Sequence, residues 1–89
     1  SINLNNAIPS ITKKVEAVYF YPNPTDNGRI TSTLSVNKIR VLSLSGTLLF
    51  ETAQLEKNQN LDLSALQSGF YLLEIQTNDK IAYQKLRIK

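Results

Sequence analysis

From residue 15 onward, short runs of alternating apolar and polar residues follow one another, each interrupted by turn-forming residues. Alternation with a period of two indicates a half-buried β-strand, because successive side chains of a strand point to opposite faces. No window of about eleven residues or more keeps the period of roughly 3.6 that marks an amphipathic helix. The pattern predicts seven short strands, at residues 15–20, 29–36, 39–44, 47–52, 61–63, 70–77 and 81–88.

Turn-forming residues separate these runs. The first run stops at residues 21–24, where two prolines fix φ and push the residue before each of them toward extended or turn geometry. Gly28 closes a polar turn and is free to take a positive φ. Residues 37–38 are short enough for a tight connection, and Ser45-Gly46 predicts a hairpin turn. Because residues 39–44 carry apolar side chains on both sides, we expect both faces of that strand to be covered.

Residues 64–69 hold the one helical signal, a single turn that Ser64 could cap and Gly69 could end. Tyr71 follows closely, just inside the strand predicted at 70–77. A tyrosine in this position is typical of the tyrosine corner, in which the hydroxyl bonds to backbone a few residues upstream. The alternative is a core aromatic with a solvent-exposed edge.

Seven short strands with turns every 8–12 residues or so predict an all-β fold, an immunoglobulin-like sandwich of about seven antiparallel strands. Residues 1–17 are polar, rich in asparagine and interrupted by Pro9, so we expect a linker or flexible arm there and one domain over residues 18–89. Because the chain begins with Ser1 and not with methionine, we interpret it as a piece of a longer protein.

Catalytic, cofactor-binding and metal sites have little support in the composition. The chain has no cysteine and no histidine, which removes the usual general bases, nucleophile pairs and metal ligands. Its seven acidic residues are scattered, and its three glycines each fit a turn and not a phosphate-binding loop. We therefore predict no enzyme activity, no cofactor and no metal.

The net charge of +3 is too mild to imply a nucleic-acid partner, and no apolar run approaches the ~20 residues that cross a membrane. The bases are concentrated near the end, where residues 80–89 hold four of them and no acid. A solvated strand face explains this simply. Alternatively, the last strand is a sheet edge whose unpaired backbone groups dock a partner strand or a second copy, while its lysines discourage promiscuous pairing.

Four sequence features are weak signals singly, but their order and spacing together form a specific pattern. Together they resemble the type A C-terminal sorting domain of the type IX (Por) secretion system, from about Val18 to Lys89. They are the opening Tyr21, Pro22, Asn23 and Pro24; Gly46 after residues 39–45; residues 66–73, with Leu66, Gly69 and Tyr71; and the terminal Lys85, Leu86, Arg87, Ile88 and Lys89. Gln84 stands where a second lysine is frequent in this family, and Leu42-Ser43 where a Tyr-Asp pair is common.

The resemblance implies a C-terminal secretion signal carried by an upstream passenger in the same chain. The passenger would reach the periplasm first, and an outer-membrane translocon would then recognise the folded domain. A surface sortase would remove the domain, leaving the passenger at the cell surface or outside the cell. In this family residues 85–89 correspond to the motif tied to recognition. Deleting residues 86–89 should then abolish export and leave the domain mostly folded, and processing should fall within or just before residues 1–18.

A second hypothesis is a carbohydrate-binding or adhesive sandwich of a surface protein. Such modules bind glycans on a platform of exposed aromatics, for which the candidates are Tyr19, Phe20, Tyr21, Phe50 and Tyr83. By alternation Tyr83 shares a face with Lys85 and Arg87, which favours its exposure. A spacer between domains is a third and less favoured interpretation.

Overall fold

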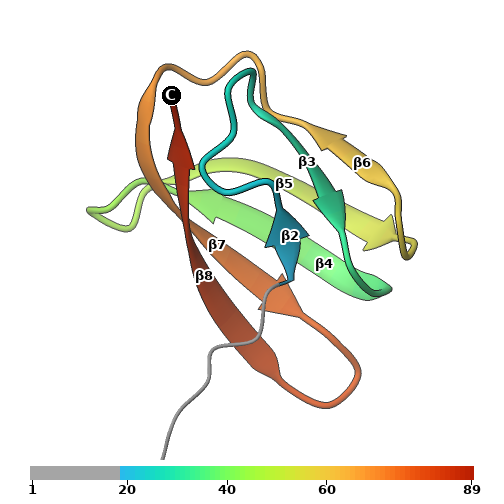
Figure 1. Ribbon diagram of the computed structural model, residues 1–89. Helices are drawn as coiled ribbons and strands as arrows, with labels where there is room; N and C mark the ends of the chain where they lie inside the picture. The colour runs from blue at the N-terminus through green and yellow to red at the C-terminus, as the bar shows by residue number, and fades with distance from the viewer. Residues whose placement is uncertain (1–18) are drawn as a thin grey trace, which may run out of the picture.

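The structure is a computed structural model that describes residues 19–89 (Figure 1). Within these residues it contains seven strands and no helix, which confirms the all-β prediction. The strands are β2 (Phe20–Tyr21), β3 (Arg29–Ser32), β4 (Val36–Leu42), β5 (Leu48–Leu55), β6 (Asn60–Asp62), β7 (Gly69–Gln76) and β8 (Ile81–Ile88). The predicted linker at 1–17, and residues 15–18 of the first predicted run, lie outside the described residues.

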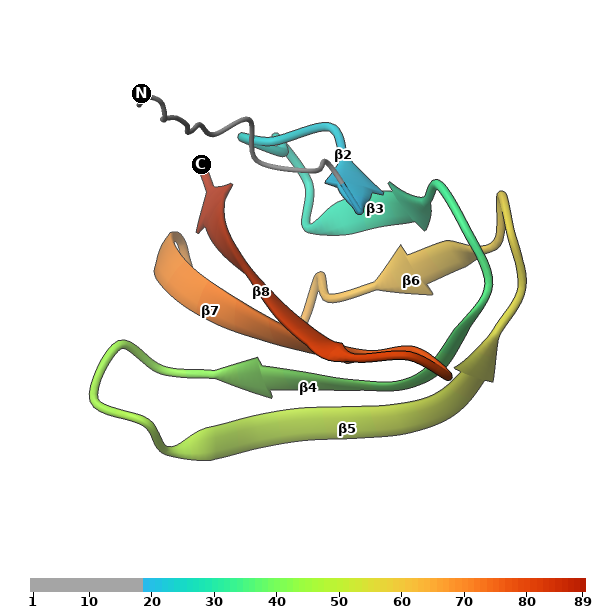
Figure 2. The same ribbon diagram turned by 90° about the horizontal axis from the view of Figure 1, so that it is seen from below.

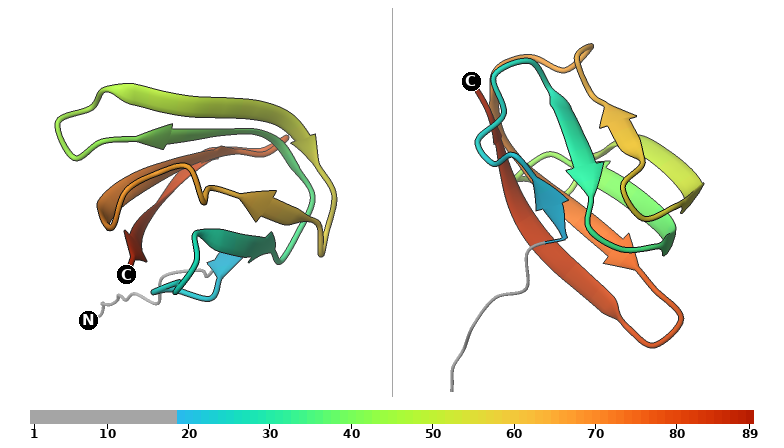
Figure 3. Two further views of the ribbon diagram at one scale, coloured as in Figure 1. Left: turned by 90° about the horizontal axis from the view of Figure 1, so that it is seen from above. Right: turned by 45° about the vertical axis from the view of Figure 1, so that its right-hand side comes forward.

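Two antiparallel sheets face each other as a sandwich (Figures 2 and 3). The smaller sheet has the strand order β2-β3-β6, and the larger has the order β5-β4-β7-β8. The chain passes between the sheets after β3, after β5 and after β6. The predicted immunoglobulin-like sandwich is therefore confirmed, with β5 and β8 at opposite edges of the larger sheet.

The hydrophobic core lies between the two sheets. Alternate residues of β4 and β7 point into it, so that Ile39 pairs with Ile75 and Val41 with Leu73, all fully buried. The apolar positions of the period-two pattern in the sequence are therefore the residues of this inner face. The remaining core side chains are Tyr19, Phe20, Ile30, Val36, Leu55, Leu61, Leu63, Tyr71, Leu86 and Ile88.

The strand predicted at 29–36 is wrong in its second half. β3 ends at Ser32, and the chain then crosses to the other sheet, where Val36 begins β4. The Ser32 hydroxyl donates to the Leu34 carbonyl, which closes a local turn where the chain leaves β3. The predicted connection at 37–38 therefore lies inside β4.

The helical turn predicted at 64–69 is also wrong. Leu66 N–H donates to the Leu63 carbonyl at 3.0 Å, so the segment is a turn, and the Asp62 carboxylate accepts from the Ser64 N–H at 2.9 Å. Asp62, one residue before the turn's first carbonyl, thus fills the role expected of Ser64. Leu66 packs against the core.

The β4–β5 hairpin forms at the predicted Ser45-Gly46 turn. Gly46 N–H donates to the Ser43 carbonyl at 2.9 Å, and Gly46 has a φ of +95°. The strand does not continue to Leu44 as predicted: Leu44 lies in the turn and is 63% exposed, so the expected covering of both faces is wrong there.

Tyr71 makes the bond expected of a tyrosine corner. Its hydroxyl donates to the Gln67 carbonyl, four residues upstream, while its ring belongs to the core. This bond anchors the turn before β7 to the strand itself.

Residues 19–89 contain no helix long and apolar enough to cross a membrane.

Candidate functional site

The two motifs at opposite ends of the domain lie against each other. β8 carries residues 85–88 at the edge of the larger sheet, and residues 21–25 run alongside it (Figure 3, right). Asn23 Nδ2 donates to the Lys85 carbonyl at 2.7 Å, and the Arg87 N–H donates to Asn23 Oδ1 at 3.0 Å. One carboxamide thus supplies the donor and the acceptor that a neighbouring strand would otherwise supply.

Thr25 continues this contact with its backbone. Thr25 N–H donates to the Arg87 carbonyl, and Lys89 N–H donates to the Thr25 carbonyl, both at 2.9 Å. These bonds form a parallel bridge between Thr25 and Ile88, and Thr25 is fully buried. The last strand is an edge strand, as predicted, but from the Lys85 carbonyl to the Lys89 N–H its outer backbone groups are already bonded. A partner strand or a second copy therefore cannot pair with that stretch unless residues 23–25 move.

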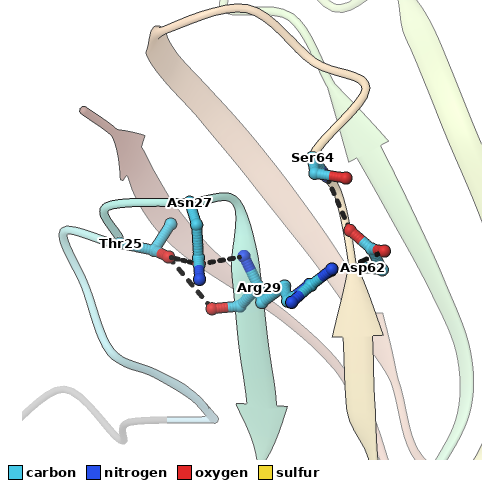
Figure 4. A network of polar contacts seen from close by, with 5 residues as sticks. All are labelled: Thr25, Asn27, Arg29, Asp62 and Ser64. Atoms are coloured by element: carbon cyan, nitrogen blue, oxygen red, sulfur yellow. Dashed lines mark hydrogen bonds and ion pairs between the residues drawn. The ribbon is translucent and has the colours of Figure 1, made fainter.

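A network of polar contacts holds Thr25 in place (Figure 4). The Thr25 hydroxyl donates to the Arg29 carbonyl at 3.0 Å and lies 3.2 Å from Asn27 Oδ1. Asn27 Oδ1 also accepts from the Arg29 N–H at 2.9 Å. The turn between β2 and β3 is thereby fixed at its base, next to β8.

The same network reaches β6 through Asp62 (Figure 4). Arg29 Nε lies 3.7 Å from Asp62 Oδ2, and both side chains are exposed. Hydrogen bonds from Ser64 hold the pKa of the Asp62 carboxyl below its usual value, and the Arg29 charge adds to the effect.

The backbone at Gly28 leaves no room for a side chain. Its φ is +81°, and a Cβ placed on it would lie 2.8 Å from the Leu63 carbonyl oxygen. The Gly28 carbonyl accepts from the Leu63 N–H at 2.8 Å, which explains why the two backbones approach so closely.

Gln84 joins β8 to the other sheet. Its Oε1 accepts from the N–H groups of Tyr19 and Phe20 at 2.9 and 3.0 Å, and its Nε2 donates to the Phe20 carbonyl at 2.9 Å. Gln84 stands where a lysine is frequent in the family that the sequence resembles. The structure gives it three bonds to backbone, two of which a lysine could not accept.

The terminal motif alternates between core and surface. Leu86 and Ile88 are buried, whereas Lys85, Arg87 and Lys89 are exposed. Lys89 Nζ lies 3.5 Å from Asp26 Oδ1, and the Arg87 guanidinium lies over the Phe70 ring, 5.6 Å from its centroid. Within residues 19–89 the Lys85 ammonium makes no ion pair.

The burial of Leu86 and Ile88 argues against the expectation that deleting residues 86–89 leaves the domain mostly folded. That deletion removes two core side chains and the backbone groups that bond Thr25. The terminal motif is therefore part of the fold as well as part of the surface.

The other residues of the predicted structural motifs stand in or beside turns. Tyr21, Pro22 and Pro24 are exposed, and both X-Pro bonds of the opening motif are cis. Gly69 has a φ of +153° at the start of β7.

The aromatic platform expected of a carbohydrate-binding module does not form within the described residues. Tyr19 and Phe20 are buried in the core. Of the remaining candidates, Tyr21 lies in the smaller sheet, and Phe50 and Tyr83 lie on β5 and β8, at opposite edges of the larger sheet. Over residues 19–89 there is also no group of three or more acidic, histidine or cysteine side chains that could hold a metal ion.

Comparison with known proteins gives one family. The sequence model of the family described as the secretion system C-terminal sorting domain matches residues 19–89. No protein of established annotation matches the chain.

Proposed function

Because the chain belongs to the family of type IX secretion-system C-terminal sorting domains, we propose that residues 18–89 direct an upstream passenger in the same chain across the outer membrane. The observation that supports this most is the contact between the two motifs through Asn23 and Thr25. Two of the four features that carry the resemblance, the opening and the terminal motif, thus lie against each other in the folded domain.

The outer-membrane translocon recognises this domain in its folded form. Within residues 85–89 the outward backbone groups are largely bonded and two side chains are buried. What remains accessible is the set of basic side chains, Lys85, Arg87 and Lys89. Recognition therefore depends on side chains held at strand spacing and not on a free extended tail.

The domain acts in this role without catalysis of its own. The passenger crosses the periplasm before the translocon binds the domain. A surface sortase then removes the domain at a bond within or just before residues 1–18, and the passenger stays at the cell surface or outside the cell. A mature passenger that retained Tyr21 would contradict this processing site.

A secretion assay tests the proposal. Residues 1–89 are fused to a periplasm-directed fluorescent reporter, in a host with a working type IX system and in a translocon-deficient sibling. We expect reporter at the surface or in the medium of the competent host alone, shortened by up to the 10.0 kDa of residues 1–89. Reporter that stays in the periplasm of both hosts would overturn the sorting function. Exported reporter of full length would keep the sorting function and remove the sortase step.

A further inference from the structure

The outer face of the larger sheet, which points away from the smaller sheet, is ordered in rows. Residues that pair directly across antiparallel strands share a face. The pairs Leu42–Leu48, Leu42–Leu72 and Leu72–Lys85 therefore place four side chains in one row across all four strands. The neighbouring row contains Glu51, Arg40, Glu74 and Tyr83.

The row through Arg40 and the next row, with Lys38, hold two bases and two carboxylates that pair with one another. Arg40 Nε lies 3.5 Å from Glu51 Oε2, and Arg40 Nη1 lies 3.9 Å from Glu74 Oε2. Lys38, one row further on, lies 3.3 Å from the same Glu51 oxygen. In this half of the outer face the basic side chains therefore lie within ion-pair distance of carboxylates.

The other half of the outer face is different, and we call it the apolar–basic end: Leu42, Leu48, Phe70, Leu72, Lys85 and Arg87. Leu48 and Phe70 are 50% and 51% exposed, and Leu42 and Leu72 are half-buried. Within residues 19–89 neither Lys85 nor Arg87 has a carboxylate partner, and Arg87 lies over the Phe70 ring. The hairpin next to it adds exposed Leu44 and Leu49.

We propose that the apolar–basic end is the face on which the domain docks to the export machinery, and that the machinery's surface there is apolar with carboxylates opposite Lys85 and Arg87. The proposal rests on the sorting function and names the chemistry of its partner. Contiguous exposed apolar side chains mark interaction sites, and aromatic residues and arginine are enriched in protein interfaces relative to the rest of the surface. Carboxylates on the partner would complement Lys85 and Arg87, which are exposed and have no ion pair within residues 19–89, whereas Lys38 and Arg40 in the other half of the same face are already ion-paired.

Two other occupants fit less well. An anionic membrane attracts each basic residue only weakly, and the apolar–basic end has two of them. A second copy related by a two-fold axis would place a face with unneutralised bases against the same face, and like charges across an interface are unfavourable.

The test uses the reporter fusion in the type IX-competent host. One variant reverses both bases, Lys85→Glu with Arg87→Glu, and its matched control reverses Lys57 and Lys80, which are exposed in turns of the domain. A second pair compares Phe70→Thr with Ile81→Thr; both residues are 51% exposed, but Ile81 lies at the other end of the outer face. All four purified fusions are first checked for an unchanged urea unfolding midpoint of the domain.

We expect the K85E/R87E and F70T fusions to lose about tenfold or more in exported reporter, and both controls to stay within about twofold of the parent. Export of all four variants at the parent level would overturn the docking face and leave the sorting function intact. Failure of the unsubstituted fusion to be exported would overturn both. If the purified parent fusion forms a dimer that K85E/R87E abolishes, or if it floats with phosphatidylglycerol vesicles and K85E/R87E does not, the face belongs to a second copy or to lipid and the proposal is wrong.

Discussion

The backbone N–H of Arg87 donates to Oδ1 of Asn23, across 64 residues of sequence. The amide nitrogen of the same side chain donates to the Lys85 carbonyl, so Asn23 bonds two successive outward-facing groups of β8. A carboxamide, whose NH₂ donor group and acceptor oxygen lie side by side in a plane, is suited to this, because the edge of an antiparallel strand offers an acceptor and a donor side by side. The opening motif of the domain is therefore a support for the terminal one.

Replacing Asn23 by alanine removes both bonds. We expect Asn23→Ala to lower the free energy of unfolding by about 1–2 kcal/mol, since each exposed bond contributes roughly 0.5–1.5 kcal/mol. Urea denaturation followed by circular dichroism measures the change. Asn37→Ala is the control, because it breaks one exposed side-chain bond, to Asn78. An equal cost for the two substitutions would contradict the role given to Asn23.

Alanine substitutions at Gly28 and Gly46 separate the effect of a steric clash from the effect of backbone conformation. Both have a positive φ, so alanine costs about 1–2 kcal/mol at either position. At Gly28 the new Cβ also meets the Leu63 carbonyl, whereas at Gly46 no atom lies within 4 Å. We expect Gly28→Ala to be less stable than Gly46→Ala by a further 1–3 kcal/mol or so in urea denaturation. Equal stabilities would mean that β3 moves away from Leu63 without cost.

Gln84→Lys is expected to destabilise the domain. A lysine cannot accept the two N–H groups of Tyr19 and Phe20, and leaving partly buried donors unbonded costs about 1–3 kcal/mol. Gln67→Lys makes the same change at an exposed position in the turn before β7 and should be close to neutral. Thermal unfolding measures the melting temperatures of the two variants. Similar melting temperatures would show that the bonds of Gln84 do not contribute to the stability of the domain.

Acid should weaken the domain through two surface carboxylates. Hydrogen bonding to Lys38, with the Arg40 charge, lowers the pKa of Glu51, and bonds from Ser64 lower the pKa of Asp62. A carboxyl with a lowered pKa in the folded state stabilises the fold above its unfolded pKa, and the contribution is lost as the pH falls through the folded pKa. The urea midpoint should therefore decline as the pH falls below about 4.5.

Both groups are exposed, so the decline should be small. The variant with Glu51→Gln and Asp62→Asn should show a shallower decline over the same pH range. A decline identical to that of the parent protein would assign the acid sensitivity to other groups.

Deleting residues 86–89 should unfold the domain. Loss of a buried leucine side chain alone costs about 2–5 kcal/mol, and the deletion also removes Ile88 and the bonds to Thr25. We expect the truncated domain to show no cooperative transition in urea. A cooperative transition near the parent midpoint would contradict this. Loss of export by the truncation would thus report folding as well as recognition, which is why surface substitutions at Lys85 and Arg87 are the sharper test.

The strands with clean alternation were predictable from sequence. The last strand was expected at 81–88 and occupies Ile81–Ile88, because its core and surface residues alternate over its whole length. The break after Ser32 was not predictable in this way. Ile30, Leu34 and Val36 keep the period of two across the crossing between sheets, and neither glycine nor proline marks it.

Of the two residues that bond the edge of β8, Asn23 was named from the sequence and Thr25 was not, and the contacts of neither were predicted. A side-chain amide that bonds a strand edge leaves no periodic trace, and the partners of Asn23 lie more than 60 residues away in sequence. Gln84 did leave a signal: it is a polar residue on the side of β8 that also carries Ala82, Leu86 and Ile88. A polar side chain among apolar neighbours indicates a partner across the core, here the backbone of β2.

The pairing of residues 23–25 with β8 has a consequence for the order of events during synthesis. β8 is the last strand of the domain to leave the ribosome, and it supplies Leu86 and Ile88 together with the edge that residues 23–25 need. The domain therefore cannot complete its fold on a nascent chain that stops short of this strand. If the exporter accepts only the folded domain, premature termination anywhere upstream yields a passenger that lacks a functional sorting signal. Export then selects for passengers that were translated in full.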